Sequence, residues 1–93
     1  MVIGLCTVEL HFPESHSLKA KRQILSSLTT RLRGKFNISV AEVDAQDLWQ
    51  KAVLGIACIS NESKRVNQLL EQVLNTIQAN PSLELLRSYR ELL

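Results

Sequence analysis

Three basic side chains near residue 20 are the residues of this sequence best placed to bind a charged partner. Lys19, Lys21 and Arg22 fall in the first turn of a predicted helix over residues 18–33. Free backbone N–H groups and the helix dipole already make that turn positive, so each cation there is unfavourable by about 0.3–1 kcal/mol. A phosphate would be held jointly by the dipole, the amides and these side chains.

Helical geometry divides these cations between two faces. Lys19, Arg22 and Arg33 share a face with Ser26, whereas Lys21 falls inside the leucine stripe. We expect Lys21 to extend along apolar surface at the edge of the sheet with its ammonium group in water. The candidate residues for binding an anion or RNA are therefore Lys19, Lys21, Arg22 and Arg33. The alternative is a solvated basic face that binds no ligand.

A tryptophan lies among polar residues in the connection between the second and third predicted strands. Asp47, Trp49 and Gln50 are candidates for contact with a partner, because a tryptophan ring offers a large contact area and an N–H donor. Trp49 can equally close one end of the hydrophobic core. Both interpretations stay open at the level of sequence.

No arrangement of residues typical of an enzyme is recognisable. Glu9 and His11 share one face of the first strand, but no nucleophile, third group or metal-ligand spacing accompanies them. Cys6 and Cys58 lack zinc-site spacing, so we expect buried thiols. The sequence predicts a non-enzymatic protein without metal or cofactor.

Two binding templates can be compared with the chain directly. The glycine-free stretch FPESHS does not fit a phosphate-binding loop, and the stretch VLGIACIS has no aromatic residue on which a base could stack. Any RNA contact is therefore expected to involve mainly phosphates and to weaken with salt.

Composition and charge indicate one small domain over residues 1–93, with 45% hydrophobic residues. Residues 15–41 carry six basic and no acidic residues, whereas the rest of the chain holds five basic and nine acidic ones. Neither a membrane span nor a signal peptide is predicted, so we expect a cytoplasmic protein. A domain of this size buries a modest core, and a homo-oligomer is one way to bury more surface.

Hydrophobic periodicity predicts six elements in the order strand, helix, strand, strand, helix, strand. Strands are expected over 2–12, 36–43 and 51–60. Helices are expected over 18–33 and from an N-cap at Ser60 or Asn61 to the pair Asn80-Pro81, which ends the second helix. Ser15 or Ser17 should cap the first helix, and Gly34 should end it. The tail after Pro81 has helical propensity, but the sheet favours a strand. The expected α+β fold is a ferredoxin-like βαββαβ sandwich, with both helices on one face of an antiparallel sheet of spatial order fourth, first, third, second.

Several stretches resemble the YlxP-like family of small bacterial proteins of unknown function. The resemblance covers essentially the whole chain and rests on residues 17–22 (SLKAKR), 36–44 (FNISVAEVD), 46–50 (QDLWQ) and 60–61. It implies a ferredoxin-like fold. Because genes of this family often lie beside genes for translation initiation and ribosome maturation, it also implies a role linked to translation, without assigning catalytic residues.

Two hypotheses follow from the sequence. The first is a non-enzymatic factor associated with translation or the ribosome, which contacts structured RNA through the basic face of the first helix. The second is a homo-oligomeric protein-interaction module that pairs through the uncovered sheet face or an edge strand and has no role with nucleic acid.

Overall fold

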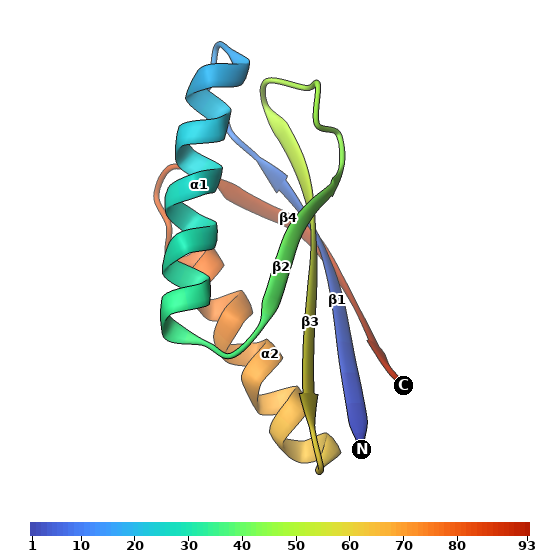
Figure 1. The fold of residues 1–93 in the computed structure, drawn as a ribbon. Helices are drawn as coiled ribbons and strands as arrows, with labels where there is room; N and C mark the ends of the chain where they lie inside the picture. The colour runs from blue at the N-terminus through green and yellow to red at the C-terminus, as the bar shows by residue number, and fades with distance from the viewer.

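The computed structural model describes all 93 residues and contains two helices and four strands (Figure 1). The order of the elements along the chain is the predicted one, strand, helix, strand, strand, helix, strand. The elements are β1 (Val2–His11), α1 (Leu18–Lys35), β2 (Ser39–Asp44), β3 (Lys51–Ser60), α2 (Ser63–Gln78) and β4 (Glu84–Leu92).

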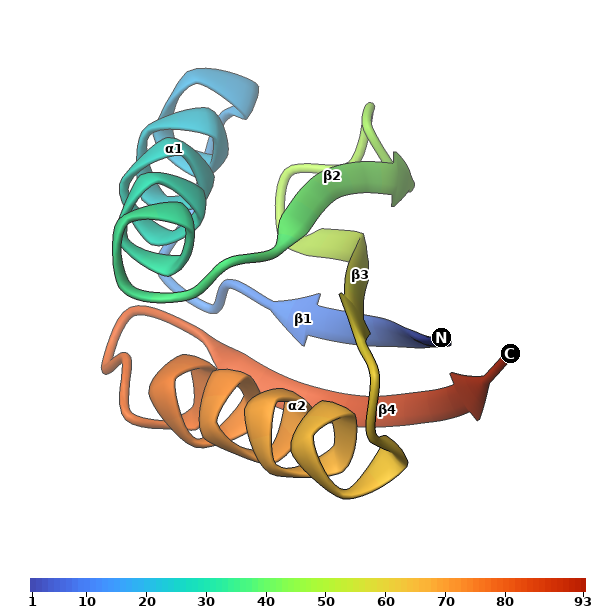
Figure 2. The same cartoon turned by 60° about the horizontal axis from the view of Figure 1, so that its bottom comes forward.

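The four strands form one sheet in the order β2-β3-β1-β4, and every neighbouring pair is antiparallel. Both helices cover the same face of this sheet and leave the other face open (Figure 2). The arrangement confirms the expected ferredoxin-like α+β fold and its strand order. The tail after Pro81 is a strand, as the sheet requires, because β1 needs a partner on its second edge.

Alternation along the two central strands builds the core. Side chains of β1 and β3 that face the helices are buried, and they pack with the apolar stripes of α1 and α2 into one cluster of 19 buried residues. Gly4 allows α2 to lie close to β1, since a Cβ there would collide with Val66. The core therefore lies entirely between the sheet and the helices.

Several predicted boundaries were wrong by a few residues. Ser17 caps α1 as predicted, with its hydroxyl accepting from the amide of Ala20 at 3.0 Å. Gly34 does not end the helix. The chain stays helical to Lys35 because Phe36 continues the buried stripe, and β2 consequently begins at Ser39. The N-cap of α2 is Glu62, whose side chain makes no capping bond, and not Ser60 or Asn61.

Candidate functional site

Lys21 differs most from its prediction. Its side chain is fully buried, and its ammonium group donates to Glu42 Oε2 at 3.0 Å. The carbonyl oxygens of Ala45, Lys51 and Gln46 also accept from it, at 2.9, 3.0 and 3.3 Å. These four oxygens replace the water that a surface lysine keeps. Lys21 therefore neither extends into solvent nor belongs to an anion-binding face.

The acceptors around Lys21 fix the connection between β2 and β3, which we call the 45–50 loop. Ala45 has a φ of 61°, the only positive φ at a non-glycine residue, and Asp44 Oδ1 accepts from its amide at 2.7 Å. At the other end, the side-chain amide of Gln50 donates to the carbonyl of Ser15 at 3.1 Å, and the carbonyl of Gln50 accepts from Phe12 at 2.8 Å. Lys21 and Gln50 therefore anchor the loop to the start of α1.

The 45–50 loop presents two apolar side chains to solvent. Trp49 is 56% exposed and Leu48 is 51% exposed, so the interpretation of Trp49 as a plug for the core is wrong. Both line a shallow hollow with His11 and Lys51 at the end of the sheet. Asp47 is exposed in the same loop, and the contact of these residues with a partner stays a prediction.

The solvent-facing side of α1 keeps only part of the predicted basic site. Arg33 donates to the carbonyl of Val40 at 2.8 Å and so ties the helix to the edge strand β2. Lys19 and Arg22 are exposed and form no ion pair. They line a shallow depression that we call the outer face of α1 and that comprises Lys19, Arg22, Gln23, Ser26, Ser27 and Thr30.

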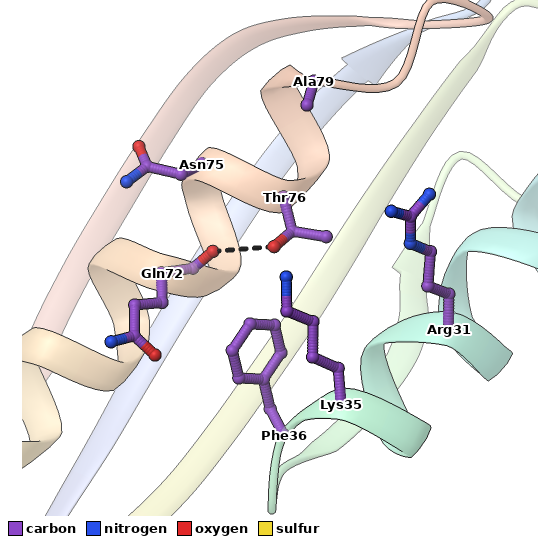
Figure 3. Close-up of a pocket in the computed structure, with 7 residues that line it drawn as sticks. All are labelled: Arg31, Lys35, Phe36, Gln72, Asn75, Thr76 and Ala79. Atoms are coloured by element: carbon purple, nitrogen blue, oxygen red, sulfur yellow. Dashed lines mark hydrogen bonds between the residues drawn. The ribbon is translucent and has the colours of Figure 1, made fainter.

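A second basic area lies in a groove between the two helices (Figure 3). Arg31 and Lys35 reach it from α1, and the ammonium group of Lys35 points toward Thr76 of α2. The Lys35 ammonium also lies 5.4 Å from the centre of the Phe36 ring. Sequence reasoning counted these cations but missed their groove. Arg31 and Lys35 are four residues apart and therefore lie on one side of α1, opposite Lys19 and Arg22. This spacing could have indicated a second basic area.

The open face of the sheet is apolar along β3 from Val53 to Ile59 and at Ile3 and Leu5 of β1, whereas Thr7, Glu9, His11 and Lys51 make the rest of these two rows polar. One row across the sheet pairs Ala41 with Gly55, Gly55 with Thr7, and Thr7 with Tyr89. Ile59, Tyr89 and Val43 are each more than half exposed. We use the name open face for this uncovered side of the sheet. Its uncharged residues include Ile3, Leu5, Thr7, Ala41, Val43, Val53, Gly55, Ala57, Ile59 and Tyr89.

Charged side chains gather at the end of the open face near the 45–50 loop, and they pair with one another. Glu9 lies 3.4 Å from Lys51 Nζ and 3.3 Å from Arg87 Nε, while His11 Nδ1 lies 3.5 Å from Glu84 Oε2. Arg87 also donates to the Tyr89 hydroxyl at 2.9 Å, which raises the pKa of its guanidinium. Glu9 and His11 thus pair with different partners instead of forming an acid–base couple.

The two cysteines are buried free thiols, as predicted. They lie on the adjacent strands β1 and β3, where Gly4 pairs with Cys58 and Cys6 pairs with Ile56. Burial raises the pKa of both thiols. No group of three or more metal-ligating side chains comes together, and neither helix is both long and apolar enough to cross a membrane.

Comparisons with known proteins agree with this fold. A family model described as a protein of unknown function, DUF503, matches residues 3–90. The uncharacterized protein YlxP of Bacillus subtilis (strain 168) is 36% identical over 83 residues, which cover 89% of this chain and 90% of that protein. A dimeric ferredoxin-like protein from an uncultured marine organism superposes with a TM-score of 0.53 at 10% identity, over 100% of this chain and 96% of its own. The last likeness shows the fold alone, whereas the first two show that the chain belongs to the DUF503 family of YlxP-like proteins.

Proposed function

We propose that this chain works as a homodimeric protein-interaction module joined through the open face of its sheet. The observation that carries the proposal is a sheet whose uncovered side carries apolar side chains from both central strands and whose charges near the 45–50 loop are paired. Helices cover only the opposite side (Figure 2). Contiguous apolar surface left in water is typical of an interaction site.

The area of the open face is sufficient for a specific dimer. Strands of about nine residues and four strands side by side give a face of roughly 30 by 19 Å, or about 600 Å² per copy. Two copies would then bury about 1,200 Å² together, which is at the lower end of the range for specific interfaces. The sheet alone is thus just large enough, and contacts beyond its edge would strengthen the association.

The charges of the open face favour burial against a second copy. Glu9 lies between Lys51 and Arg87 and is neutralised by them, and His11 faces Glu84. A desolvated charge is strongly unfavourable when it is unpaired, and much less so when its partner accompanies it. These paired charges can therefore lose water at a lower cost. Glu91 lies on the edge strand β4 opposite Leu5 and has no ion-pair partner, so it has to stay in solvent at the rim of the interface. The dimeric ferredoxin-like neighbour shows that this fold is found as a dimer.

Sedimentation equilibrium at micromolar concentration tests the proposal. The protein should sediment as a dimer, and Ala57→Glu, which places a carboxylate in the middle of the open face, should make it monomeric. Gln78→Glu adds the same charge to an exposed position of α2 and should leave the dimer intact. A monomeric native protein would contradict the proposal.

The outer face of α1 favours a second function, contact with RNA phosphates in a translation-linked process. Lys19 and Arg22 are unpaired, lie beside three hydroxyl side chains, and have no acidic residue in their helical turn. A face-to-face dimer would leave both copies of this surface in solvent. The free thiols of Cys6 and Cys58 fit a reducing compartment, and we include a cytoplasmic location in the proposal.

Fluorescence anisotropy with a labelled, structured ribosomal RNA fragment tests this second function. Lys19→Gln/Arg22→Gln should weaken binding and reduce its salt dependence by about two phosphate contacts. The matched control, Lys64→Gln/Arg65→Gln, removes two positive charges from α2 and should bind almost normally. Equal binding by the native protein and the α1 variant would exclude the outer face of α1 as the contact.

A further inference from the structure

The 45–50 loop is held more firmly than its connecting role requires. Two antiparallel strands can be joined by a two-residue turn. Here a fully buried lysine donates to one carboxylate and three carbonyls around the loop, and Ala45 adopts an unfavourable φ of 61°. The result is a rigid support for Trp49 and Leu48, which remain in solvent. An apolar anchor that is fixed before binding loses little entropy when it docks.

Trp49 continues the open face beyond the end of the sheet. It shares a hollow with His11 and Lys51, which end the outward-facing rows of β1 and β3. Figure 1 shows the loop at the end of the sheet where α1 begins. A second copy seated on the open face would therefore reach Trp49, and this contact would enlarge an interface that the sheet alone makes only just large enough.

The same face offers a cavity for a large ring. Small residues form its floor, because Ala41, Gly55 and Ala57 lie side by side on β2 and β3. The side chains of Leu5, Thr7 and Val43 surround this hollow of about 360 Å³. Val43 leans over Gly55, where an added Cβ would lie 3.0 Å from Val43 Cγ1.

The anchor and the cavity are related by a simple symmetry. Trp49 and Ala57 lie four residues to either side of Val53. A two-fold axis that lies between two face-to-face copies, parallel to both sheets, perpendicular to β3 and over Val53, exchanges these positions between the copies. A two-fold interface uses the same patch on both subunits. The open face and its adjoining loop meet this requirement, because one copy carries both the anchor, Trp49, and the cavity that would receive it.

We propose that Trp49 of each copy inserts into the hollow over Gly55 and Ala57 of the other, about a two-fold axis at Val53. The inference rests on the proposed homodimer and adds its geometry. Lys21 is a positioning residue in it, because it holds the loop that carries Trp49. The occupant of the hollow is thus a second copy of this chain.

Sedimentation equilibrium of Trp49→Ala measures the contribution of the anchor. A tryptophan buried in a partner's cavity is a typical hot spot, so its removal from both copies should weaken dimerisation at least about 30-fold. Because Trp49 lies outside the core, the circular dichroism spectrum and melting temperature of a monomeric control such as Ala57→Glu should not change when Trp49→Ala is added. Lys64→Ala, at an exposed position of α2, should leave the dimer constant unchanged.

Cross-linking locates the axis independently. Val53→Cys should join two copies through a short bismaleimide, whereas Gln23→Cys on α1 should not, and the native protein should react little because both of its thiols are buried. A native monomer would overturn the homodimer itself. A native dimer that Ala57→Glu disrupts, but that tolerates Trp49→Ala and is not joined through Val53→Cys, would overturn this inference and leave the homodimer standing.

Discussion

The open face of the sheet and the outer face of α1 differ in whether their basic side chains have acidic partners. Cations beside the open face each have an acidic partner, with Lys51 and Arg87 on either side of Glu9. On α1, Lys19 and Arg22 have none, although acidic residues are common elsewhere in the chain. A surface on which most charges are paired suits burial against protein, whereas unpaired cations suit a partner that brings negative charge.

Two lysines in one turn of α1 show the same contrast on a smaller scale. Lys19 is exposed and unpaired, whereas Lys21, two residues later, is completely buried among four oxygen atoms. Both lysines belong to the same run of basic residues in the sequence. They point to different sides of the helix, so Lys19 is a surface charge and Lys21 is a structural one.

The largest expected effect comes from removing the buried charge. Lys21→Met should lower the free energy of unfolding by about 3–5 kcal/mol, because Glu42 and the loop carbonyls lose the donor that satisfies them. Lys19→Met should change it by less than about 0.5 kcal/mol. Urea titrations of the two variants make the comparison, and equal losses would contradict the distinction between these lysines.

Salt should separate the two faces. Raising the salt from 50 to 200 mM should weaken RNA binding roughly tenfold if Lys19 and Arg22 each meet a phosphate. The dimer constant should scarcely change, because it depends on apolar contact and on charge pairs within each copy. Anisotropy and sedimentation at both salt concentrations check this, and a dimer that dissociates as steeply as the RNA complex would remove the contrast.

A smaller effect is expected from the two buried cysteines on the covered side of the sheet, which should make stability depend on pH. Burial raises the pKa of Cys6 and Cys58, so the folded state keeps thiol protons that the unfolded state releases above about pH 8.5. The stability due to the neutral thiols is fully present below that pH and is lost as the pH rises. Urea unfolding from pH 8 to 10 should show a steeper decline for the native protein than for Cys6→Ala/Cys58→Ala. Identical slopes would show that the thiols contribute nothing.

The elements could be predicted from the sequence because periods of two and 3.6 residues mark strands and helices on their own, and their spatial order then followed from the right-handed crossover of each βαβ unit. The same periodicity placed Lys21 in the buried stripe of α1. It did not reveal the oxygen atoms around Lys21, which come from β2, the 45–50 loop and the start of β3. The exposure of Trp49 depends on that same tertiary arrangement. Local sequence patterns therefore predict the helices and strands. The conformation of the 45–50 loop cannot be predicted from them, because it depends on contacts between segments that are distant in the sequence.

The central claim is that the open face joins two copies of the chain. Sedimentation equilibrium of the native protein and of Ala57→Glu, both at micromolar concentration, tests it most directly. The native protein should be a dimer and the variant a folded monomer, and Gln78→Glu should remain dimeric. A native protein that stays monomeric, or a variant that dimerises as tightly as the native chain, would contradict it.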